Sequence, residues 1–209
     1  MPGVGTRWRV EWSPVVALVC LVLALPGVGD RGTMAAESPD RDAVAALLRD
    51  IETKTSRASA LAKAGSYDEA IPLWFAAARR IEKFEAGLSP EDMERFSLFK
   101  PMALIRYAIG DCLNEAGRHR EAVEELEKAE VCVRQYTAND PEERASWMFL
   151  VVVHTSKTVA FSELGEEEQA DAERDALGKT CEEALRHHPR DKDLTEILEG
   201  IAAYRAGTR

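Results

Sequence analysis

The fold prediction starts from the stretch Gly65–Trp74, which reads GSYDEAIPLW. Its glycine is a typical helix terminator, because glycine takes the left-handed backbone conformation of a helix cap at little cost. Ala70 lies five residues later and would let two helices approach closely, and apolar residues at helical spacing surround it. The stretch therefore predicts the turn and the second helix of a helix–turn–helix unit.

The same pattern occurs three times along the chain. In each copy a large apolar residue lies four positions before a glycine, and an alanine lies five positions after it. The three sets are Leu61, Gly65 and Ala70; Leu113, Gly117 and Ala122; and Phe161, Gly165 and Ala170. Three copies in phase predict an array of repeated units, in which each helix pair buries an apolar flank against the next.

This pattern resembles that of the tetratricopeptide repeat family, whose turn motif Gly-x-Tyr-x-x-Ala is complete in Gly65, Tyr67 and Ala70. In the second unit, Gly110 occupies the small-residue position of the family's first helix. The resemblance covers roughly residues 45–190. It implies an all-α fold: a right-handed superhelix of antiparallel helix pairs with a concave groove for a protein or peptide partner.

The third unit and the spacing depart from the family pattern. Glu167 takes the aromatic position, and Arg174 takes a packing position. The glycines are 52 and 48 residues apart, against 34 residues for a standard repeat. About seven added residues in a helix are two turns, which keep the same face inward. We therefore expect elongated helices.

The prolines and caps divide the chain into seven expected helical segments. Pro101 is expected to kink or interrupt the third segment, since proline lacks the amide hydrogen of a helix interior. The last segment carries apolar residues on one face and is expected to cap the end of the array. The segments cover about 40–64, 67–86, 89–114, 118–137, 141–163, 167–187 and 191–205.

The N-terminal residues differ from the remainder. Arg7 and Arg9 precede the apolar run Val15–Leu25, which as a helix spans about 16 Å against about 30 Å of bilayer core. A basic start with a short apolar centre is typical of a secretory signal peptide. The predicted division is a signal peptide or anchor over 1–30, a linker over 31–39 and a helical repeat domain over 40–209.

This N-terminus predicts export, to a bacterial-type periplasm or as a secreted protein. Two alternatives stay open. The segment could remain as an uncleaved membrane anchor, or translation could begin at Met34 and leave the protein in the cytoplasm.

Charge and composition exclude some classes of partner. The formal net charge is −10, which disfavours nucleic acids because binding them requires positive charge. Cys112, Cys132 and Cys181 are too widely spaced for a disulfide framework and are expected to be buried apolar residues. Because no nucleophile, phosphate-loop or metal-ligand motif is apparent, we expect a non-catalytic protein without a cofactor or metal.

In the tetratricopeptide family the partner lies in a groove lined by the first helix of each repeat. Mapping those positions onto this sequence gives a candidate groove that would suit a peptide with basic or polar side chains and one apolar anchor. The paired lysines and asparagines with which the best-known members hold a C-terminal carboxylate are absent from most matching positions. The candidate residues are Arg106, Tyr107, Asp111, Asn114, Glu115, Thr155, Val159 and Ser162.

A second candidate contact surface lies beside the expected helix break, where Phe96, Phe99 and Met102 could form a protruding apolar patch or could cap the core. The function that these patterns favour is a protein- or peptide-binding scaffold or adaptor of the cell envelope. The alternatives are a small-molecule binder or enzyme with a cleft between helix layers, and a structural subunit that self-associates.

Overall fold

The computed structural model describes residues 41–88 and 98–207, and over these residues the fold is all-α, with seven helices and no strand. The helices are α2 (Arg41–Lys63), α3 (Tyr67–Glu85), α5 (Phe99–Glu115), α6 (His119–Asn139), α7 (Arg144–Glu163), α8 (Glu167–His187) and α9 (Lys192–Gly207). The all-α prediction is therefore confirmed.

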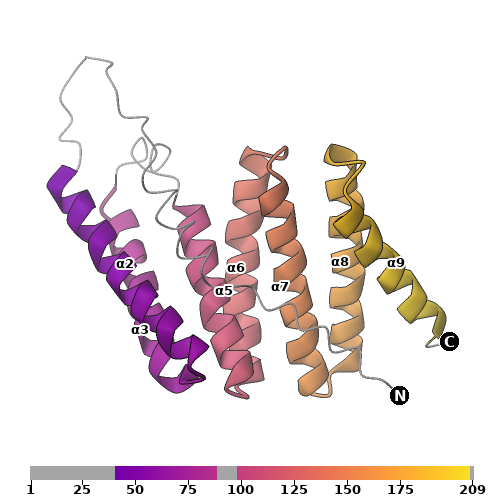
Figure 1. Ribbon diagram of the computed structural model, residues 1–209, viewed down its shortest axis with the longest axis horizontal. Coiled ribbons are helices and arrows are strands. Elements are labelled where there is room, and N and C mark those ends of the chain that lie inside the picture. The colour runs from indigo at the N-terminus through magenta and orange to yellow at the C-terminus, as the bar shows by residue number, and fades with distance from the viewer. Residues whose placement is uncertain (1–40, 89–97, 208–209) are drawn as a thin grey trace, which may run out of the picture.

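The helices lie side by side in chain order, from α2 at one end of the molecule to α9 at the other (Figure 1). Each described helix contacts the next described one, and α5 also contacts α7, which is two helices further on. None of the described helices combines the length and the apolar character that crossing a membrane requires.

Three tight turns have the geometry that the glycine pattern predicts. Gly65, Gly117 and Gly165 have φ angles of 78°, 75° and 72°. In the first turn, the amide of Ser66 donates to the carbonyl oxygen of Leu61 at 2.9 Å. The other two turns contain the same hydrogen bond, at 2.8 and 2.9 Å. This pairing satisfies carbonyl groups at the helix end, so the next helix can begin two residues after each glycine.

The predicted close approach of helices is also present. A Cβ atom added to Gly110 of α5 would lie 2.6 Å from Cγ of Leu126 in α6, which leaves room only for glycine. Ala70, Ala122 and Ala170 are each 0 % exposed. Gly110 therefore allows α5 and α6 to pack closely, and the three alanines belong to the buried apolar core.

A helix boundary lies close to Pro101, near which the sequence predicts a kink or an interruption. Helix α5 begins at Phe99, so Pro101 lies in its first turn, where an amide hydrogen has no partner within the helix in any case. The proline thus occupies a position in the first turn of α5 that tolerates it. Residues 89–97, over which the segment was expected to begin, lie outside the described residues.

Candidate functional site

Helices α5 and α7 carry all eight predicted groove residues, and the two helices are in contact. The ring of Tyr107 packs edge-on against Phe149 with centroids 5.6 Å apart, and Nδ2 of Asn114 donates to the carbonyl oxygen of Ser156 at 3.2 Å. Later residues of α5 thus meet later residues of α7, so the two helices run in the same direction. We use the name α5–α7 seam for the predicted groove residues on these two helices other than Arg106 and Tyr107, which are Asp111, Asn114, Glu115, Thr155, Val159 and Ser162.

The seam residues differ in how far a partner could reach them. Val159 is 49 % exposed and Glu115 is also exposed, whereas Asp111, Asn114, Thr155 and Ser162 are half-buried. Tyr107 is only 3 % exposed, and burial raises the pKa of its hydroxyl group. Tyr107 therefore supports the seam from beneath by packing, and the binding role of the other residues stays a prediction.

Arg106 lies away from the seam. Its guanidinium group pairs with Glu82 of α3 and, at 2.6 Å, with Oε2 of Glu125 in α6. Glu125 also accepts from Lys128 at 2.6 Å. Arg106 thus joins three helices through charged hydrogen bonds, which is a structural role that its place in the sequence pattern does not reveal.

One end of the seam is negatively charged. Asp111 and Glu115 lie in the last turns of α5, and Glu163 is the last residue of α7. The C-terminus of a helix itself carries a partial negative charge, and here two such ends lie on adjacent helices that run in the same direction. A positively charged group bound at this end would therefore be stabilised.

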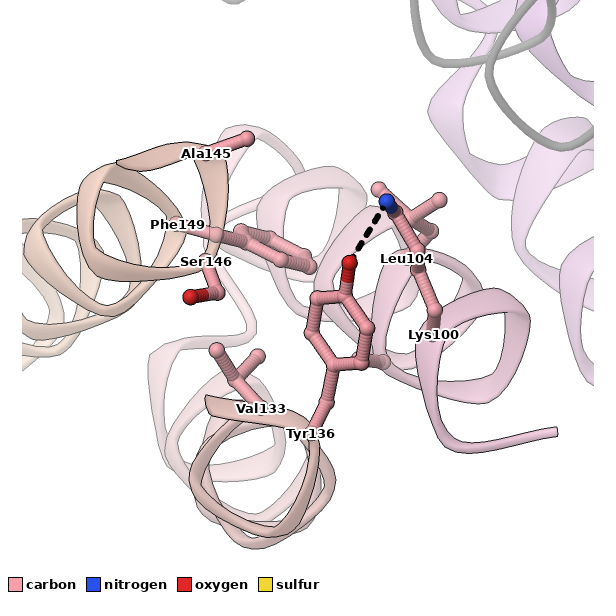
Figure 2. Close-up of a pocket in the computed structure, with 8 residues that line it drawn as sticks. Lys100, Leu104, Val133, Tyr136, Ala145, Ser146 and Phe149 are labelled. Atoms are coloured by element: carbon pink, nitrogen blue, oxygen red, sulfur yellow. Dashed lines mark hydrogen bonds between the residues drawn. The ribbon is translucent and has the colours of Figure 1, made fainter. Parts of the chain in front are cut away.

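A small cavity of about 70 Å³ lies at the other end of α5, between α5, α6 and α7 (Figure 2). Lys100 reaches across it and donates to the Tyr136 hydroxyl and to Oε1 of Glu143, each at 2.8 Å. The remaining wall is mostly apolar and includes Leu104 and Phe149. The volume is roughly half of the 150 Å³ of a protein cavity known to admit benzene, so the cavity is suited to one small apolar side chain at most.

The second predicted contact surface is only partly described. Phe96 lies outside the described residues. Met102 is 7 % exposed and belongs to the apolar core, while Phe99 is half-buried in the first turn of α5. Met102 is therefore a core residue here, and the role of the other two stays a prediction.

A cluster of charged side chains with a buried centre joins α6, α7 and α8, and sequence reasoning missed it. His154 is 1 % exposed, and its Nδ1 lies 2.8 Å from Oε2 of Glu173. The ammonium group of Lys157 lies 2.9 Å from Oε2 of Glu130 and 2.6 Å from Oε1 of Glu173. Arg134 completes the set, with Nε 2.8 Å from Oε1 of Glu130. We call these five residues the α6–α8 cluster.

Each ionised member of the cluster is stabilised by its neighbours. Burial alone would raise the pKa of Glu130 and of Glu173. Hydrogen bonds from Lys157 and Arg134 outweigh burial at Glu130 and lower its pKa. Hydrogen bonds from His154 and Lys157 do the same at Glu173. Burial would likewise lower the pKa of Lys157, and its two carboxylate partners raise it instead. The carboxylates and the ammonium group therefore hold their charges inside the protein.

Glu130, His154 and Glu173 together offer one histidine nitrogen and two carboxylate oxygens within 4.8 Å of one another. These are ligand types that a divalent metal accepts. The ammonium group of Lys157 already bridges the two carboxylates, however, so a metal ion would have to displace a buried positive charge. The arrangement is better described as an ion-pair network with an internal cation.

The three described cysteines are free. Cys112 and Cys181 are 1 % and 0 % exposed, and burial raises their pKa values to about 12 and about 11. Burial raises the pKa of Cys132 as well. Because the thiolate is the reactive form, these surroundings oppose nucleophilic chemistry at all three positions.

Comparison with known proteins gives no relative: no protein-family model matches the chain, and no curated protein matches it. The tetratricopeptide resemblance therefore rests on the residues quoted above.

Proposed function

We propose that this protein is a non-catalytic scaffold that binds a protein or peptide, built from about three elongated repeats of the tetratricopeptide type. The observation that carries the proposal is the α5–α7 seam, where polar and acidic residues and the exposed Val159 lie on two adjacent helices of the same direction. Rigid, packed helices suit such a role, because a preformed surface loses little conformational entropy on binding.

The finer architecture belongs to the same proposal. We infer antiparallel helix pairs stacked into a right-handed superhelix and closed by α9. The glycine turns support the pairing, since each joins two long helices through a few residues. The contact between α5 and α7 supports the stacking, because these are the first helices of successive units.

The chemistry of the seam favours a basic peptide. Asp111 and Glu115 are one turn apart on α5, which is about 6 Å along the helix axis. Alternate residues of an extended peptide lie on one side and are spaced by about 6.6 Å. Two basic side chains in an alternating pattern would therefore match the two carboxylates, and an apolar side chain beyond them could cover Val159.

The test is direct binding of fluorescein-labelled peptides that contain Lys-Ala-Lys-Ala-Leu or Glu-Ala-Glu-Ala-Leu, measured by fluorescence polarisation. We expect the first to bind and the second not to bind. The variant D111K/E115K should weaken binding of the lysine peptide at least tenfold, while E124K/E127K, with the same charge change on exposed positions of α6, should leave it unchanged. If both variants are folded by circular dichroism and lose the same affinity for the lysine peptide, the effect arises from net charge. The seam would then not be the binding site.

We further propose that the protein acts in the cell envelope, on the basis of the basic and apolar N-terminal residues. N-terminal sequencing of the protein purified from its native cell distinguishes the possibilities. A first residue near position 30 supports export with cleavage, an intact N-terminus in the membrane fraction supports an anchor, and a start at Met34 contradicts export.

A further inference from the structure

The hydrogen-bond partners of His154 decide where its proton lies. Its Nδ1 is 2.8 Å from Oε2 of Glu173, and its Nε2 is 3.3 Å from Nη2 of Arg134. A guanidinium group can only donate a hydrogen bond, so Nε2 must accept one. An ionised carboxylate can only accept, so Nδ1 must carry the proton. A neutral ring with its proton on Nδ1 is the form that satisfies both contacts.

The charges of the α6–α8 cluster favour the same form. Every charged side chain that the described contacts place against His154 is a member: Glu130 and Arg134 from α6, Lys157 from its own helix, and Glu173 from α8. Two carboxylates balance two cations when the histidine is neutral. A proton added to His154 would give the five side chains one net positive charge and would place a charged ring nitrogen against the guanidinium group of Arg134.

We propose that Arg134 controls the protonation state of His154, holding the ring neutral while the guanidinium contacts Nε2. Removing that contact has two consequences. The cluster is left with one net negative charge, and Nε2 is left 3.8 Å from Oε1 of Glu130. A proton on Nε2 then restores electrical balance and turns towards that carboxylate, so the histidine becomes charged.

Arg134 is exposed at the protein surface, so the protonation state of His154 can depend on what contacts that surface. Its side chain is 48 % exposed, whereas those of Glu130, Glu173 and Lys157 are 17, 16 and 6 % exposed. Of the five cluster residues, Arg134 alone also lines a surface pocket of about 180 Å³ between α6, α7 and α8, beside Trp147 and His187. A surface event that draws the guanidinium away would thus alter the charge of the core at the junction of three helices. This inference is independent of peptide binding at the seam.

The test is nitrogen-15 NMR of the histidine rings in the full chain at pH 7.5, with the His154 signals assigned by their loss in H154Q. The wild type should show a neutral ring with the proton on Nδ1. The variant R134M should show the pattern of a charged ring, with both nitrogens protonated. R134K, which keeps a positive donor, should retain the neutral form, and R79M should do so as well, because Arg79 is an exposed residue of the distant helix α3.

Two results would overturn the inference. One is a wild-type ring that is charged or carries its proton on Nε2. The other is a neutral ring in R134M. Arg134 is largely solvent-exposed, so the variant should fold, and its circular dichroism spectrum checks this. If R134M proves unfolded, the wild-type and R134K spectra still decide the position of the proton.

Discussion

At the scale of single residues, the glycines of the three turns have the clearest physical role. Each has a positive φ angle between 72° and 78°, a conformation that costs a residue with a side chain roughly 1–2 kcal/mol. No atom lies within 4 Å of a Cβ added to Gly65, Gly117 or Gly165. The requirement for glycine at these positions is therefore conformational and does not arise from crowding.

The substitution G117A should lower the free energy of unfolding by about 1 kcal/mol, since alanine is strained at a φ of 75°. Gly200 provides a matched control, because it lies within helix α9 and a Cβ there also meets no atom within 4 Å. G200A should raise stability by about 0.5–1 kcal/mol through the greater helix propensity of alanine. Urea unfolding of both variants measures this, and two changes of the same sign would contradict the account.

At the scale of helices, the α6–α8 cluster ties three of them together through charges. Both glutamates have pKa values below their ordinary value of 4.5 in the folded protein. Their contribution to stability is therefore fully present above that pH and is lost as the pH falls through the folded values. Each carboxyl group can account for up to about 1.4 kcal/mol per pH unit in that range.

The variant E173Q isolates this effect, because glutamine keeps the size of the side chain and does not titrate. We expect E173Q to be less stable than the wild type at pH 7, and the difference to shrink as the pH falls from 5 to 3. E127Q, at an exposed position of α6, should differ little from the wild type throughout. Urea unfolding across this pH range is the measurement, and a difference for E173Q that does not change with pH would refute the prediction.

At the scale of the whole molecule, α9 covers one end of the helical row. Leu194 is 0 % exposed, and Ile197, Leu198 and Ile201 pack against an apolar cluster that includes Cys181 of α8. In Figure 1, α9 leans away from α8 towards its own C-terminal end. Arg144 of α7 also pairs with Asp193 near the start of α9. The helix therefore shields an apolar flank that would otherwise face water.

A chain that ends at Asp191 should lose at least about 2 kcal/mol of stability, since burying one leucine contributes about 1.5–3 kcal/mol. It should also self-associate through the uncovered flank. Thermal unfolding and light scattering over a range of concentrations measure both effects. Removal of residues 206–209 alone is the control and should change neither. A truncated chain that stays monomeric with unchanged thermal stability would show that α9 does not cap the row.

The sequence by itself determined much of the secondary structure. The glycine and alanine pattern predicts three turns, and the structure has them at Gly65, Gly117 and Gly165. Helix starts and ends are local events, decided by caps and backbone preferences within a few residues. The all-α class and the course of the helices over 41–88 and 98–207 follow from such local signals. The start of α5 at Phe99 also lies close to the break expected near Pro101.

The tertiary structure alone decided the surroundings of individual side chains. Nothing near His154 in the sequence indicates that Glu130 and Glu173 lie against it, because the three residues are on different helices and meet only when α6, α7 and α8 pack. Tyr107 matched a groove position by spacing and Arg106 lies next to it in the sequence, yet Tyr107 is buried and Arg106 pairs with α3 and α6. Periodicity in the sequence identifies one face of a helix. Which residues cover that face depends on how helices that are far apart in the sequence pack against each other.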